Sequence, residues 1–138
     1  GRIVVIGGGL IGTEAAIQMS LDPENQVTIV EMLPEIMNGC SDCDHIVYSD
    51  MIREKKIQVL TSARVLEIGD DGVTAEWKGR RQVIPADHVL LATGMKPNRQ
   101  LYEELKEKGV CVRNVGDSLQ PGKIYDAIHT GYKAGLKI

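Results

Sequence analysis

A short apolar run followed at once by a glycine-rich turn constrains this chain more than any other feature of its sequence. Residues 3–6 read Ile-Val-Val-Ile, and residues 7–12 read Gly-Gly-Gly-Leu-Ile-Gly. A continuous apolar run of this length is typical of a strand buried on both faces. Residues 10–20 then predict a helix, and residues 27–30 repeat the buried-strand pattern. This β-α-β succession predicts parallel strands joined by a right-handed crossover.

The same pattern continues through a second helix and a third strand. Ser41 and Asp44 stand at the spacing of a capping box, and apolar pairs four residues apart follow them. We therefore expect a helix from about residue 42 to residue 55. Residues 57–60 (Ile-Gln-Val-Leu) predict a third parallel strand.

The middle of the chain changes character. Three short runs at residues 63–68, 73–77 and 80–84 are separated by glycine-containing turns. Such spacing predicts a three-stranded antiparallel meander. Residues 87–92 return to a buried strand. The sequence therefore predicts an α/β chain, with a Rossmann-type three-layer fold that combines a parallel sheet with an antiparallel β-meander.

A Pro-Asn break at residues 97–98 divides the chain. We expect one domain over residues 1–98 and a separate segment over residues 99–138. The elements expected in that segment are a charged helix at 100–108, a strand at 110–115 and a final helix that begins near Ile124.

Composition excludes several classes of protein. With 43% hydrophobic and 25% charged residues, the chain is typical of a globular domain. No apolar run approaches the roughly 20 residues of a membrane span. A net charge of -3 gives no support to a nucleic-acid partner. Three cysteines, an odd number, favour a reducing, cytoplasmic setting. The chain opens on a strand-like run without Met, so we expect a piece of a longer polypeptide without a signal peptide.

The glycine run has the spacing of a dinucleotide fingerprint. Gly7, Gly9 and Gly12 occupy the three glycine positions of G-x-G-x-x-G. In such a turn the first glycine allows the tight bend, the second lets a pyrophosphate approach the backbone, and the third lets the helix pack closely on the strand. The free N–H groups at the start of the helix then attract the phosphate charge. An acidic residue, Glu31, ends the second strand at the expected distance.

The acidic residue also indicates which dinucleotide is bound. A carboxylate at Glu31 can accept hydrogen bonds from the adenosine ribose hydroxyls, and it would repel the 2′-phosphate of NADP. Met32, Leu33 and Pro34 follow, so no arginine stands next to it to offset that repulsion. The sequence therefore favours NAD(H) over NADP(H).

Three motifs, taken in order, resemble the pyridine nucleotide-disulfide oxidoreductase superfamily. They are Gly7-x-Gly9-x-Ile11-Gly12-x-Glu14, Ala92-Thr93-Gly94-x-x-Pro97-Asn98 and Val115-Gly116-Asp117. The tail over residues 116–131 is similar to the C-terminal region of NADH:flavin oxidoreductases of the enoate reductase and 2,4-dienoyl-CoA reductase type. Enzymes of that type join a barrel, which holds FMN and an iron–sulfur cluster, to an FAD domain and an NAD(P)H domain.

The resemblance implies a role for each matching residue. The implied contacts are Gly7, Gly9, Leu10, Ile11 and Gly12 with the pyrophosphate, Glu31 and the adjacent Met32 with the adenosine ribose, Ala63 and Val65 with the adenine, Glu14 and Gly94 with the nicotinamide half, and Gly116 with Asp117 for FAD.

The resemblance implies an NADH-binding module that presents nicotinamide for hydride transfer to FAD, with residues 99–138 as the returning part of an FAD-binding domain. The implied partners are NADH and the remaining FAD and barrel domains of the parent polypeptide. Only one glycine fingerprint is present, so we expect the isolated chain to be inactive. Two alternatives stay open at this point: an FAD-binding domain of the same superfamily, and a non-catalytic NAD-sensing module.

Cys40 and Cys43 form a C-x-x-C pair at the expected start of the second helix. A redox pair and a zinc site are both conceivable there. The zinc site lacks a clear fourth ligand and a second C-x-x-C, and the family's redox disulfide lies in the FAD half. We therefore interpret this segment as a helix cap, and we expect no metal site.

Overall fold

The computed structural model describes residues 1–137. The chain divides into two compact units, Gly1–Gly94 and the residues from Met95 onward, and each is described by itself. Within residues 1–137, every helix falls short of the length and apolar character that a membrane span requires.

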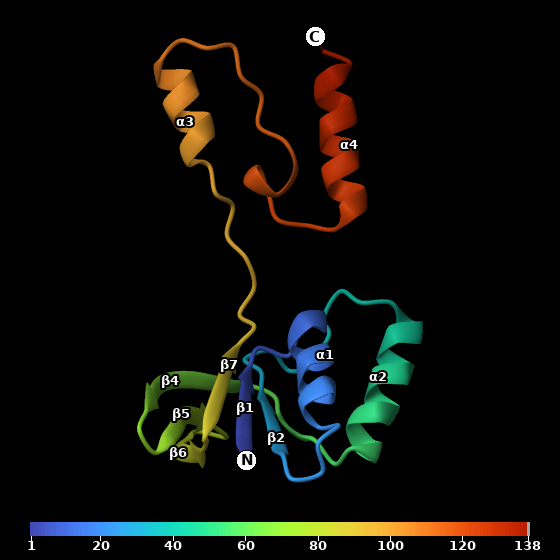
Figure 1. Cartoon of the computed structure of the whole chain (residues 1–138), viewed down its shortest axis with the longest axis vertical. Coiled ribbons are helices and arrows are strands. Elements are labelled where there is room, and N and C mark those ends of the chain that lie inside the picture. The colour runs from blue at the N-terminus through green and yellow to red at the C-terminus, as the bar shows by residue number, and fades with distance from the viewer. Residues whose placement is uncertain (138) are drawn as a thin grey trace. The chain divides into compact units, whose positions relative to one another are not determined.

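A four-stranded parallel sheet forms the centre of Gly1–Gly94 (Figure 1). The strand order is β3-β2-β1-β7, and two helices make the crossovers between β1, β2 and β3. The elements are β1 (Arg2–Ile6), α1 (Leu10–Met19), β2 (Gln26–Val30), α2 (Asp42–Glu54), β3 (Gln58–Leu60) and β7 (His88–Leu91).

An antiparallel sheet of three strands lies between β3 and β7 in the sequence, in the order β4-β5-β6. Its turns are the two glycine-containing segments expected from the sequence. The pairing of β4 with β5 shifts register between Val65 and Glu67, which marks a bulge. The strands are β4 (Ala63–Gly69), β5 (Gly72–Trp77) and β6 (Arg80–Pro85).

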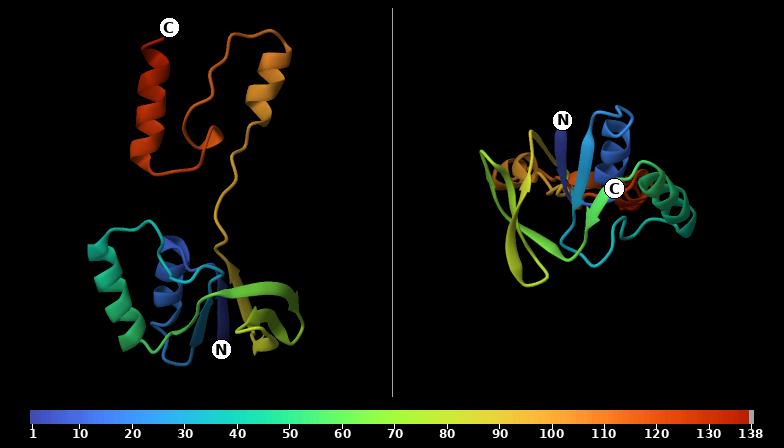
Figure 2. Two further views of the ribbon diagram at one scale, coloured as in Figure 1. Left: turned by 180° about the vertical axis from the view of Figure 1, so that it is seen from behind. Right: turned by 90° about the horizontal axis from the view of Figure 1, so that it is seen from below.

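The parallel sheet is the middle of three layers, because both of its faces are covered. Successive side chains of β1 point to opposite faces. Ile3 and Val5 belong to a hydrophobic cluster shared with α1 and α2. Val4 and Ile6 belong to a second cluster shared with the meander. Figure 2 shows the two helices on one side of the parallel strands and β4–β6 on the other. The predicted Rossmann-type fold is therefore confirmed.

The second helix begins where the sequence predicted. The Ser41 hydroxyl accepts a hydrogen bond from the Asp44 N–H at 3.2 Å, so Ser41 is the N-cap of α2. It also donates to the Asp44 carboxylate at 2.8 Å. The helix cap predicted for this segment is thus confirmed.

Residues 95–137 contain helices without a sheet. The strand predicted at residues 110–115 is wrong, since this segment has no strand structure in the described chain. A strand needs a neighbour to pair with, and among residues 95–137 no strand is present to provide one. The observed elements are α3 (Gln100–Glu107), the short 3-10 helix η1 (Gly116–Ser118) and α4 (Ile124–Gly135).

Candidate functional site

Two glycines of the turn between β1 and α1 are required by packing. Gly7 has φ +102°, and a Cβ there would overlap the carbonyl oxygen of Ala92. A Cβ on Gly12 would overlap the Gly7 carbonyl oxygen and lie 3.1 Å from the Ala92 side chain. The turn, the first helical turn and the end of β7 are therefore too close together for any larger residue.

Gly9 differs from these two glycines, because a Cβ there would meet no atom within 4 Å. Its backbone is extended (φ -67°, ψ -177°), which any residue can adopt. Gly9 is the N-cap of α1 and supplies no capping side chain. The start of α1 therefore presents backbone N–H groups and the positive end of the helix dipole at an open surface, an arrangement suited to an anion.

Glu31 lies directly after β2, and only 7% of its surface is exposed. One carboxylate oxygen accepts from the Gly8 N–H at 2.5 Å, and the other accepts from the Leu33 N–H at 2.7 Å. A carboxylate has about four lone-pair positions, so each oxygen retains capacity for a further donor. The carboxylate is thus held against the glycine turn and can still accept from a ligand.

A cleft of about 470 Å³ lies at the carboxyl ends of the parallel strands, where the glycine turn and Glu31 are found. The carboxyl ends of parallel strands are where α/β sheets bind ligands. The cleft brings together seven of the residues predicted from the sequence, namely Gly7, Gly9, Glu31, Met32, Ala63, Val65 and Gly94. Gly94 has φ +90° and, like Gly9, faces open space.

The other predicted residues of Gly1–Gly94 lie along α1. Leu10, Ile11 and Gly12 form its first turn, next to the cleft in sequence but outside its lining. Glu14 follows one turn later, and the Tyr48 hydroxyl of α2 donates to its carboxylate at 2.7 Å. This hydrogen bond raises the pKa of Tyr48.

Gly116 and Asp117 belong to the other compact unit, where they open η1. Gly116 has φ +62°, and its N–H donates to the Thr130 hydroxyl at 2.9 Å. Asp117 is exposed, and it accepts from the Gly122 N–H at 3.3 Å.

The sequence reading missed several residues that line the cleft. Gly8 is one, because the fingerprint treats its position as variable, and Arg64 is another. The Arg64 side chain is 70% exposed and lies 3.7 Å from the Glu76 carboxylate on β5. Within residues 1–137 it is the one basic residue in the lining. The sequence offered one indication that Arg64 lies near the cleft, which is its position between the predicted residues Ala63 and Val65. The remaining unpredicted lining residues are Ile6, Val30, Leu33, Glu35, Asn38, Ala92 and Thr93.

Cys40, Cys43 and Cys111 are free thiols. Cys40 is half-buried and Cys43 is exposed, on either side of the Ser41 cap. Among residues 1–137, no three His, Cys, Asp or Glu side chains gather in a group that could hold a metal ion.

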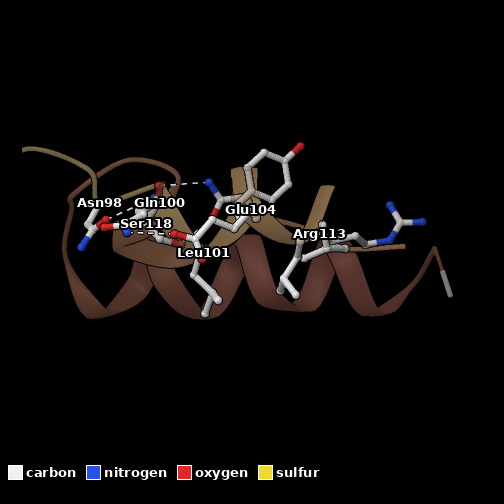
Figure 3. Close-up of a pocket in the computed structure, with 10 residues that line it drawn as sticks. Asn98, Gln100, Leu101, Glu104, Arg113 and Ser118 are labelled. Carbon is white, nitrogen blue, oxygen red and sulfur yellow. Dashed lines mark hydrogen bonds between the residues drawn. The ribbon is translucent and has the colours of Figure 1, made fainter. Parts of the chain in front are cut away.

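A second cleft, of about 520 Å³, lies within the unit that begins at Met95. Figure 3 shows Arg113 at the opposite end from Asn98 and Ser118. Within the lining, the Gln100 amide donates to the Glu104 carboxylate at 2.8 Å. Asn98 of the second sequence motif lines this cleft, whereas none of the residues with an expected cofactor contact does.

The chain is similar to known proteins in sequence and in structure. The family described as pyridine nucleotide-disulphide oxidoreductase matches residues 1–117. The chain is 37% identical over 135 residues to bilirubin reductase of Mediterraneibacter gnavus (strain CC55_001C), covering 97% of this chain and 21% of that protein. It is 38% identical over 142 residues to NADH oxidase of Thermoanaerobacter brockii, covering 99% of this chain and 21% of that protein.

A solved structure shows the same relation. The complex of 2-naphthoyl-CoA reductase with 2-naphthoyl-CoA matches 99% of this chain and 21% of its own with a TM-score of 0.84 and 29% identity. The chain thus spans about a fifth of the length of these proteins. The resemblance expected from the glycine and Gly-Asp motifs is confirmed: the chain belongs to the pyridine nucleotide-disulphide oxidoreductase family.

Proposed function

We propose that this chain is the NADH-binding module of a multidomain flavin-dependent oxidoreductase, which presents nicotinamide for hydride transfer to FAD. The observation that carries the proposal is the meeting of Gly9, the start of α1 and Glu31 at one cleft. An open helix N-terminus suits a pyrophosphate, and a buried carboxylate beside it suits ribose hydroxyls.

The proposal assigns each part of the dinucleotide to residues of the cleft or of α1. The backbone N–H groups of the turn and of Leu10, Ile11 and Gly12 would bind the pyrophosphate. Glu31 would accept from the adenosine ribose beside Met32, and Ala63 and Val65 would flank the adenine. Gly94 would let the nicotinamide half approach the backbone, with Glu14 nearby. When bound, the dinucleotide supplies the hydride, and the protein contributes orientation and charge.

Glu31 is the residue that would select NADH. Its carboxylate is buried and held by two backbone N–H groups, so it cannot turn away from a 2′-phosphate. Two negative charges placed this close repel each other strongly when water is excluded. Arg64 lies in the same cleft, but its guanidinium is exposed and directed toward Glu76.

The FAD part of the proposal concerns the tail. Residues 1–98 would form the NAD(H) domain, and residues 99–138 the returning part of an FAD-binding domain, in which Gly116 and Asp117 contact FAD. The relatives are about five times longer than this chain, so the remaining FAD half and a barrel with FMN and an iron–sulfur cluster would belong to the parent polypeptide. The free cysteines accord with a reducing, cytoplasmic compartment.

Calorimetric titration of the full chain with NADH and with NADPH tests the proposal. We expect NADH to bind about tenfold more tightly or better, a difference of at least about 1.4 kcal/mol. Equal affinities would contradict the role of Glu31. A purified protein that is yellow, with FAD in place of NADH, would show that the cleft is a flavin site.

A further inference from the structure

The second residue of the glycine turn is hydrogen-bonded on both sides to the loop that follows β2. The Gly8 N–H donates to the Glu31 carboxylate at 2.5 Å. The Gly8 carbonyl oxygen accepts from the Met37 N–H at 2.6 Å. The same carboxylate accepts from the Leu33 N–H at 2.7 Å. Glu31 therefore joins the turn to the loop at residues 31–37 through one buried and one part-buried hydrogen bond.

The loop also packs directly on the turn. Gly8 is buried, and a Cβ there would lie 2.6 Å from the Ile36 side chain and 3.1 Å from the Glu31 side chain. Met37 is fully buried and has φ +55°. A non-glycine residue adopts this backbone only where its surroundings require it. The loop is thus a fixed partner of the turn.

These contacts set the direction of the next backbone donor. The C=O and N–H of one trans peptide point in opposite directions. Because the Gly8 carbonyl is directed at the Met37 N–H, the Gly9 N–H of the same peptide is directed away from the loop. Gly9 is the residue whose missing Cβ leaves the surface open. The loop therefore fixes the peptide that would face a pyrophosphate.

We propose that Glu31 is a positioning residue for the glycine turn, in addition to its contact with ribose hydroxyls. Its carboxylate holds the Gly8 N–H, which presets the turn for phosphate before any ligand arrives. This inference rests on the proposed function, and it adds that the loss of Glu31 weakens binding even when the ligand has no hydroxyl for Glu31 to bind. Preorganised donors avoid the cost of ordering at the moment of binding.

Glu31→Gln in the full chain is the first variant. The amide keeps one acceptor oxygen and has an NH2 group in place of the other, so it can accept from only one of the Gly8 and Leu33 N–H groups, and without a negative charge. It can still exchange hydrogen bonds with a ribose hydroxyl, so the change acts mainly on the turn. Glu67→Gln is the matched control, because Glu67 is exposed on β4 and lies outside the cleft lining.

Amide hydrogen exchange of the free protein reads the turn directly. We expect the Gly8 N–H to be protected in the wild type, and its protection to fall about tenfold or more in Glu31→Gln, the size expected for a lost hydrogen bond to a charged group. Glu67→Gln should leave it unchanged. Should Glu31→Gln fail to fold, Glu31→Asp keeps the charge on a side chain one methylene shorter, and it should show the same loss. Fast exchange of Gly8 in the wild type would overturn the proposal.

Two ligands separate positioning from ribose recognition. The first is NADH, and the second is an NADH analogue whose adenosine ribose lacks the 2′- and 3′-hydroxyls. We expect Glu31→Gln to weaken both by similar factors, about tenfold. A loss confined to NADH would show that Glu31 acts through the ribose alone, and would overturn the proposal. If the wild type binds neither ligand, the proposed function fails. The Gly8 exchange data on the free protein then decide separately whether Glu31 holds the turn.

Discussion

The two compact units of this chain differ in how they bury their apolar side chains. Gly1–Gly94 contains two hydrophobic clusters, one on each face of the parallel sheet. Among the described residues 95–137, no residue is fully buried. The large apolar side chains of α4 and of its C-cap Leu136 are instead exposed, namely Ile124, Tyr125, Ile128, Tyr132 and Leu136.

The presence of large apolar side chains in a unit therefore does not by itself produce a hydrophobic core. Ile124, Ile128 and Tyr132 recur every four residues, so they lie along one face of α4. In Gly1–Gly94 both faces of the parallel sheet are covered by other elements of the same unit. The cleft that Glu31 lines is formed entirely by this unit.

The largest expected effect concerns turnover. Hydride transfer needs an acceptor about 3–3.5 Å away and aligned with the donor. We expect the chain to bind NADH, and to show no NADH-dependent reduction of added FAD, FMN or dye above a protein-free control. Activity should return when the missing FAD half is supplied in trans. The assay follows the loss of NADH absorbance. Saturable dye reduction by the chain alone would show that the chain has a complete flavin site, and would contradict the proposal that residues 99–138 supply only part of one.

The next effect is expected at Gly9. Gly9→Val should abolish NADH binding in calorimetry and leave the fold intact, because its Cβ would point into the open cleft. Gly69→Val is the control, since a Cβ at Gly69 also meets no atom within 4 Å, but Gly69 lies outside the cleft lining. NADH binding that survives Gly9→Val would mean that the phosphates are bound elsewhere.

A matched pair of isoleucines tests the difference in core. Ile29 is fully buried, whereas 66% of the Ile128 surface is exposed. Ile29→Ala should lower the free energy of unfolding by about 2–5 kcal/mol. Ile128→Ala should change it by no more than about 0.5 kcal/mol. Urea denaturation followed by circular dichroism measures both. Similar losses would show that the chain itself covers α4 in solution.

The smallest effect is expected from the ion pair that joins β1 to the start of β7. The Arg2 guanidinium donates to the Asp87 carboxylate at 2.5 Å, and it holds the pKa of Asp87 well below its usual value. The stabilisation is therefore present above about pH 4 and is lost as the pH falls toward the pKa of the folded state. Asp87→Asn should lower the melting temperature slightly at neutral pH, and the difference should shrink progressively as the pH falls below about 4. A difference independent of pH would assign the effect to packing.

Most of Gly1–Gly94 was predictable from local patterns. Continuous apolar runs identified the parallel strands, because a strand buried on both faces has no polar side to interrupt the run. Turn residues at short intervals identified the meander, and Ser41 with Asp44 identified the start of α2. The predicted strand at residues 110–115 failed because pairing depends on a neighbour that no local pattern can reveal.

Residues of the candidate site could be predicted from the sequence where the expected role requires one particular type of residue. Gly7, Gly9 and Glu31 follow from the fingerprint, because a tight bend, an open backbone and a ribose acceptor each require a particular residue. Gly8 and Arg64 did not follow from it. Gly8 acts through its backbone, which every residue possesses. Arg64 lines the cleft because of its place in β4, which is defined by the pairing of β4 with β5.

Local residue patterns were enough to identify the strand, turn and helix that build the cleft, and the carboxylate that follows β2. The folded structure was needed to show that this carboxylate accepts from the Gly8 and Leu33 N–H groups, and that the Met37 N–H holds the Gly8 carbonyl. A periodic pattern reports only which face of an element is apolar. The hydrogen bond between the Gly8 N–H and the Glu31 carboxylate forms only when the loop packs on the turn and brings these two atoms together.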